Sequence, residues 1–110
     1  MANAAATAVT VRTERNFLTD CFSKFFTGSG TLDSDNKADG AGDSDTITVT
    51  GVALGDIVVG FSLGVDLAGI SATAYVSAAD TVTIRLQNES GGAVNLASTT
   101  VKVVVGRPAF

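Results

Sequence analysis

Hydrophobic and polar positions alternate in a series of short segments, as expected for β-strands that bury one face. In Thr46–Thr50, Ile47 and Val49 lie on one side and three threonines on the other. In Thr99–Val105, the pattern buries Val101, Val103 and Val105 and presents Thr100 and Lys102 to solvent. Strands are also predicted over Asp56–Leu63, Ile70–Ser77, Thr81–Leu86 and, as a shorter run, Gly28–Asp33.

The connections between these segments are typical of an antiparallel fold. Ile70–Ser77 and Thr81–Leu86 are joined by a short link, which predicts a β-hairpin. Asp56–Leu63 is apolar on one face and largely apolar on the other, so we expect it at the centre of a sheet. No helical pattern separates the strands, and Pro108, the only proline, follows the last one. Residues 28–110 are therefore predicted to form a single all-β domain, an antiparallel β-sandwich or jelly roll.

Residues 1–27 differ from the rest of the chain. Met1–Ala8 is mostly Ala, Asn and Thr, and we expect an arm that a partner would order. Apolar residues then recur with helical spacing from Phe17 to Phe26, with Thr13 as a candidate N-cap. This pattern predicts a short amphipathic helix between the arm and the β domain.

The phenylalanines of this segment must be buried somewhere. One interpretation is that the helix seals an open edge of its own sandwich. The other is that it packs on a second subunit, since exposed apolar surface on a small protein marks an interface. The candidate partner-interface residues are Phe17, Leu18, Phe22, Phe25 and Phe26.

Composition supports one folded domain and narrows the choice of partner. The chain has 110 residues, of which 45% are hydrophobic and 16% are charged. A net charge of −4 disfavours nucleic acid, because binding to phosphates depends on Lys and Arg. No apolar run approaches the roughly 20 residues of a membrane-spanning helix, and we expect no membrane partner.

Candidate chemistry is sparse. The chain has no His and no Trp, and its single cysteine, Cys21, leaves no partner for an intrachain disulfide. No nucleophile or phosphate-binding motif is present. We therefore predict that the protein is not an enzyme and has no catalytic, cofactor or metal site.

The acidic segment Asp33–Asp45 is where a metal site is arguable. Its five aspartates could supply the oxygens that Ca²⁺ requires. However, Lys37 and Ala38 occupy positions where an EF-hand has a ligand and a glycine, and no glutamate closes the loop. A solvated loop is the favoured interpretation, and a calcium site is the alternative.

The β region resembles a segment that recurs in virion proteins of tailed bacteriophages. The residues that carry the resemblance are Thr46–Asp56, Ser71–Asn88, Gly91–Val94 and Ala97–Val105. The family suggested is that of head decoration, or cement, proteins, and the similarity covers about residues 28–106. Residues 1–27 and the Asp33–Asp45 segment do not align with the pattern.

The resemblance implies a structural function without catalytic residues. A decoration protein would bind the outer surface of the major capsid protein shell, often as a homotrimer. It would be made in the host cytoplasm and located on the virion. Similar modules occur in tail fibres, so a tail-fibre or other virion attachment module is the first alternative. A calcium-dependent surface-adhesion module is the second.

Overall fold

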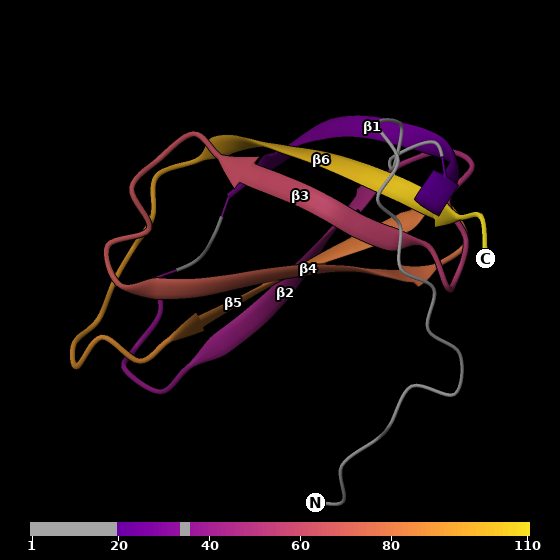
Figure 1. Ribbon diagram of the computed structural model, residues 1–110. Coiled ribbons are helices and arrows are strands. Elements are labelled where there is room, and N and C mark those ends of the chain that lie inside the picture. Colours follow the sequence, from indigo (N-terminus) through magenta and orange to yellow (C-terminus); the bar gives the residue numbers. More distant parts are fainter. Residues whose placement is uncertain (1–19, 34–35) are drawn as a thin grey trace, which may run out of the picture.

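The computed structural model describes residues 20–33 and 36–110, and these form two antiparallel sheets that face each other in a sandwich-like arrangement (Figure 1). The first sheet has the order β1-β6-β3 and the second the order β2-β5-β4. The strands are β1 Phe22–Leu32, β2 Gly42–Thr48, β3 Ile57–Leu63, β4 Ile70–Ala78, β5 Thr81–Asn88 and β6 Thr99–Pro108. The predicted all-β class is confirmed. Within this part of the chain, no helix is long and apolar enough to cross a membrane.

The two middle strands supply the centre of the core. Each has neighbours on both sides, and each turns every second side chain toward the opposite sheet. The buried positions are those that the alternation predicts. They are Val82, Ile84 and Leu86 on β5 and Val101, Val103 and Val105 on β6, all at most 2% exposed.

The predicted hairpin is confirmed as the β4–β5 pair. Its turn contains Asp80 at a φ of 60°, a left-handed conformation that Asp tolerates better than most residues. The Asp80 carboxylate accepts a hydrogen bond from the Gly51 amide at 2.7 Å, and the Asp80 amide donates to the Val52 carbonyl at 2.8 Å. The hairpin turn therefore fixes the connection between β2 and β3.

The prediction that Asp56–Leu63 is a central strand is wrong. The corresponding strand, β3, lies at the edge of the first sheet and pairs only with β6. A bulge between Val58 and Gly60 shifts its alternation, so that Ile57 and Val59 are 42% and 48% exposed. The run is apolar on both faces because one of those faces is an exposed apolar surface.

The predicted helix does not extend to Phe26: among the described residues only Asp20 and Cys21 are helical, and β1 begins at Phe22. Phe22, Phe25 and Phe26 belong to β1, which pairs with β6 along its length except for a shift near Ser23. A helix here would leave the hydrogen-bonding edge of β6 without a partner beside residues 105–108. The first part of the predicted helix, with Thr13, Phe17 and Leu18, and the arm lie outside the described residues.

Two inward-facing glycines let β1 approach the second sheet. A Cβ built on Gly28 would lie 2.7 Å from Cγ2 of Val49, and one on Gly30 would lie 2.8 Å from Cγ2 of Ile47. Both neighbouring side chains are buried and β-branched, so they have little freedom to move away. Because neither glycine carries a side chain, β1 can pack closely against Ile47 and Val49 on the side of the second sheet.

We therefore expect Gly28→Ala and Gly30→Ala to lower the free energy of unfolding by about 1–3 kcal/mol each, as overpacking in a core does. Gly60→Ala is the matched control, because a Cβ there meets no atom within 4 Å. Urea denaturation followed by circular dichroism measures all three variants. Equal stability of the Gly28 and Gly60 variants would show that the two sheets can separate here without cost.

Candidate interaction surface

The face of the first sheet that turns away from the core, here called the outer face, is organised in rows. Residues paired across antiparallel strands point to the same side, so the register defines which side chains lie next to each other. Across β1, β6 and β3, the outer-face rows are Phe25–Gly106–Ile57, Thr27–Val104–Gly60 and Ser29–Lys102–Ser62. Apolar residues thus occupy one end of the sheet, and hydroxyl and ammonium groups follow.

Two phenylalanines cover the start of the outer face. The ring of Phe22 lies over Gly106, where any Cβ would collide with it. The centroids of Phe22 and Phe25 are 5.1 Å apart, and the two rings are tilted by 47°. Gly106 is therefore the residue that allows the Phe22 ring to lie against the backbone of β6.

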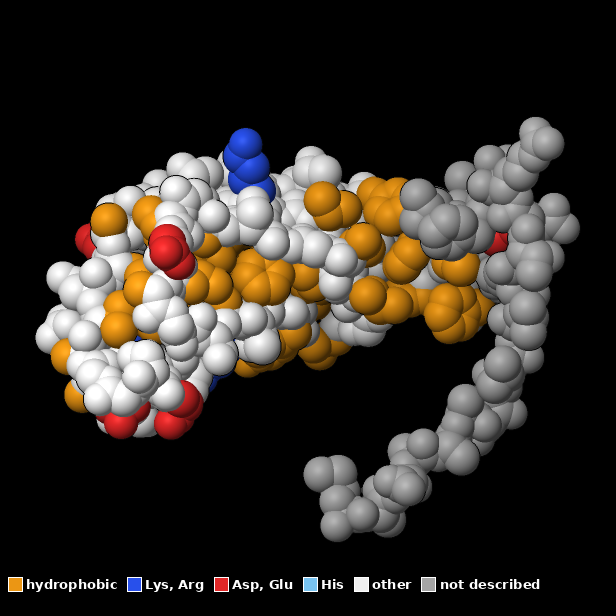
Figure 2. All heavy atoms as spheres, turned by 60° about the vertical axis from the view of Figure 1, so that its left-hand side comes forward, with side chains coloured by type: hydrophobic (Ala, Val, Ile, Leu, Met, Phe, Trp, Pro, Cys, Tyr) orange, Lys and Arg blue, Asp and Glu red, His pale blue; other side chains and the backbone are white. Residues whose placement is uncertain are grey.

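Further exposed apolar side chains surround this pair. Phe25 is 43% exposed, Val104 39%, and Leu54, in the connection before β3, 72%. We call the whole set the apolar end; it consists of Phe22, Phe25, Leu54, Ile57, Val59, Val104 and Phe110. Figure 2 shows hydrophobic side chains gathered toward its right-hand end, whereas most visible carboxylates lie toward the left. A concentration of this kind marks a site for contact with another surface.

An ion pair holds the apolar end together. Arg107 Nη2 and Nε lie 2.8 and 3.0 Å from the two carboxylate oxygens of Asp56. The same guanidinium donates to the Gly51 carbonyl at 2.9 Å and lies 5.1 Å from the centroid of Phe26. The Asp56 carboxylate also accepts from the Ala53 amide at 2.9 Å. These bonds fix the connection that carries Leu54 against the end of β6.

The ion pair shifts the pKa values of Asp56 and Arg107 in opposite directions. The hydrogen bond from Arg107 lowers the pKa of Asp56, against the opposing effect of burial, and the Ala53 amide lowers it further. The hydrogen bond to Asp56 correspondingly raises the pKa of Arg107. Both groups are thus held in their charged forms.

The opposite end of the molecule contains the acidic segment, part of which is strand rather than loop. Asp43 and Asp45 belong to β2 and pair with Leu86 and Ile84, so they turn toward the inner side. Asp43 Oδ2 lies 2.8 Å from Nζ of Lys37, whose side chain is only 4% exposed. Within residues 20–33 and 36–110, no cluster of three or more potential ligands forms a metal site.

Asn88, the last residue of β5, joins two connections at this end of the molecule. Its side chain is fully buried, and Nδ2 donates to the carbonyls of Lys37 and Gly92, both at 2.8 Å. Its Oδ1 accepts from the amide and the hydroxyl of Ser90 at 3.0 and 2.7 Å. One amide group thus satisfies the backbone of two connections.

The structure separates the predicted interface residues. Phe22 and Phe25 lie at the apolar end, whereas Phe26 lies on the inner face of β1 and packs against the core. Phe17 and Leu18 lie outside the described residues. Sequence reasoning did not identify Ile57, Val59 and Val104 as surface residues. The apolar residues on both faces of β3 could have indicated this surface. However, the same pattern fits a buried central strand, and only the register with β6 distinguishes the two.

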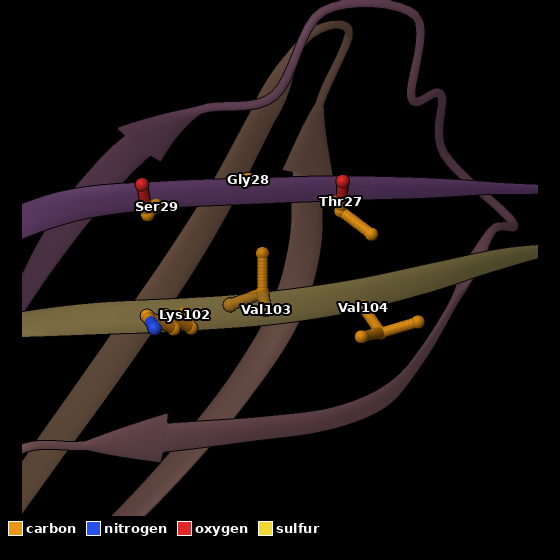
Figure 3. Close-up of a pocket in the computed structure, with 6 residues that line it drawn as sticks. All are labelled: Thr27, Gly28, Ser29, Lys102, Val103 and Val104. Carbon is orange, nitrogen blue, oxygen red and sulfur yellow. The ribbon is translucent and has the colours of Figure 1, made fainter.

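A shallow depression lies between β1 and β6 on the outer face (Figure 3). Its lining residues are Thr27, Gly28, Ser29, Lys102, Val103 and Val104. It joins the apolar end to the row that contains Lys102. Its polar groups are hydroxyls and one ammonium, which suit hydrogen bonding to a partner.

Comparison with protein-family models, with curated proteins and with solved structures gives no match to this chain.

The Asp56–Arg107 pair leads to a pH-dependent prediction. Because the pKa of folded Asp56 lies below its ordinary value of 3.8, the pair stabilises the fold above that pH. The stabilisation is lost as the pH falls through the lowered value. We expect Asp56→Asn to be less stable than the parent chain at pH 7, and the difference to shrink as the pH falls below about 4.

Urea denaturation between pH 2.5 and 7 checks this expectation. Asp66→Asn is the control, since Asp66 is exposed and its carboxylate accepts only from the nearby Ala68 amide among the described residues. A stability difference between the parent chain and Asp56→Asn that stays constant over this pH range would contradict the assigned role of the ion pair.

Proposed function

We propose that this chain is a structural virion protein that decorates and stabilises a phage capsid by binding the outer surface of the major capsid protein shell. The observation that carries the proposal is the apolar end, where large hydrophobic side chains remain exposed on an otherwise polar small domain. The resemblance of the β region to phage decoration proteins supports the same function.

The two outer faces suggest how the protein is oriented. The outer face of the second sheet is mostly hydroxyl-bearing, and its exposed residues are Ser44, Thr46, Thr48, Ser71, Thr73, Tyr75 and Arg85. A face of this kind is readily solvated and suits the outside of a particle. We therefore infer that the apolar end faces the shell and the second sheet faces water.

The N-terminal segment enters the described fold at the apolar end. The Ala109 amide donates to the Cys21 carbonyl at 2.8 Å, which places the start of β1 beside the end of β6. Cys21 therefore lies next to the surface proposed to meet the shell. This position supports the proposal that residues 1–27 anchor the protein to the shell.

The mechanism is the burial of surface across several capsid subunits, so that expansion or rupture of the shell must first break those contacts. A single domain of this size offers little area, whereas a stable interface buries about 800 Å² on each partner. We propose a homotrimer, because three linked copies bind far more tightly than one.

The central test uses Phe22→Asp combined with Phe25→Asp. Both rings lie on the outer face, so the double variant should keep its β-type circular dichroism. Burying two unpaired carboxylates against the shell should weaken binding to undecorated capsids by about a hundredfold or more. Cosedimentation with purified capsids measures the affinity.

Tyr75→Asp is the matched control, since Tyr75 is 52% exposed on the second sheet. It should bind like the parent chain. Full binding by the Phe22/Phe25 double variant would refute the role of the apolar end, and an unfolded double variant would show that these rings belong to the chain's own core.

Deletion of residues 1–19 tests the anchor role. The deletion ends before β1, whereas removal of residues 1–27 would also take the first six residues of that strand, Phe22–Thr27. We expect the shortened chain to keep its thermal unfolding transition and to lose binding to undecorated capsids. Decoration at full occupancy by this chain would show that attachment runs through the two sheets alone.

A further inference from the structure

The third row of the outer face carries a positive charge between two hydroxyls. Lys102 on β6 pairs with Ser29 on β1 and with Ser62 on β3, so the three side chains lie in line across the sheet. All three are exposed, and Figure 3 shows Ser29 and Lys102 side by side on neighbouring strands. We call this set the cationic row.

The donors of the cationic row are free to meet a partner. Among residues 20–33 and 36–110, Lys102 forms no ion pair, and the hydroxyls of Ser29 and Ser62 have no hydrogen-bond partner. Lys102 is also the only charged side chain that the described strands place on this face. By contrast, Arg107 is already paired with Asp56.

We propose that the cationic row binds a carboxylate of the capsid shell while the apolar end packs on a hydrophobic group of the same shell. This inference rests on the proposed function and adds the chemistry of the partner. An ammonium flanked by two hydroxyls presents only groups that can donate, and a carboxylate is an acceptor with two oxygens.

The spacing of the rows defines the footprint on the partner. Successive rows are two residues apart along a strand, which is about 6.6–6.8 Å. The cationic row lies two rows from Phe25 and Ile57. The shell surface must therefore offer a carboxylate about 13 Å from its apolar contact.

The charge of the whole chain favours this arrangement. With a net charge of −4, the protein would be repelled by an acidic shell from most directions. The outer face of the first sheet carries one lysine and no carboxylate on its strands, so such a shell would accept it. The outer face of the second sheet likewise carries Arg85 and no carboxylate, but it lacks the apolar end. The cationic row and the apolar end together therefore favour the orientation in which the first sheet meets the shell, and the apolar contact supplies most of the affinity.

The experiment compares Lys102→Glu and Lys102→Gln with the parent chain in cosedimentation with undecorated capsids at 20, 100 and 300 mM NaCl. We expect Lys102→Glu to bind about tenfold more weakly at 20 mM NaCl and Lys102→Gln only a few-fold more weakly. Both differences should shrink at 300 mM NaCl, because salt screens the attraction. Arg85→Glu on the second sheet changes the net charge by the same amount as Lys102→Glu and should bind normally.

The outcomes separate the inference from the proposed function. Weaker binding by Lys102→Glu, with normal binding by Arg85→Glu, supports the cationic row. Equal binding by all three variants and the parent chain overturns the inference and leaves decoration intact. Equal losses in Lys102→Glu and Arg85→Glu show a general charge effect and also overturn it. Failure of the parent chain to bind capsids removes the proposed function, and the inference with it.

Discussion

A sheet of three strands has only one strand with neighbours on both sides, and this limit governs the whole molecule. Burial must be concentrated where β5 faces β6, and the six aliphatic side chains at the centre of these two strands are almost completely removed from water. The four remaining strands are edges that can be only partly covered. The surface available for binding is therefore a consequence of how small the core is.

Local features shape the two edge strands of the first sheet, β1 and β3. Gly28 and Gly30 let β1 close against the second sheet, and the bulge in β3 turns Ile57 and Val59 outward. The Asp56–Arg107 pair then fixes the connection before β3 to the end of β6. Together these features gather exposed hydrophobic side chains at one end of the molecule without opening the core.

Alternation in the sequence was sufficient to predict the all-β class, the hairpin and the buried face of β6. It failed for β3 because a two-sided apolar run fits either a buried strand or an edge strand with an exposed apolar face. It failed for β1 because Phe22, Phe25 and Phe26 fit a helical wheel as well as a strand with an irregular start. Local pattern does not contain the register with β6, and register decides both cases.

The interaction surface was harder to predict for the same reason. Asp56 and Arg107 are 51 positions apart, and Lys102 is distant in sequence from Ser29 and Ser62. Neither the ion pair nor the cationic row exists until the strands are paired. The burial of Asn88 is a further example, since its hydrogen bonds join connections that the sequence keeps apart.

The inward-facing carboxylates of β2 affect how this edge strand can pair with other molecules. Asp43 and Asp45 sit on the inner side of an edge strand, where they retain contact with water around that edge. A strand from another molecule that paired with β2 would exclude water from this edge. The carboxylates of Asp43 and Asp45 would then be charged in a dry environment, which is unfavourable. Pairing of β2 with a strand of another molecule is therefore disfavoured, which protects the protein against aggregation through this edge.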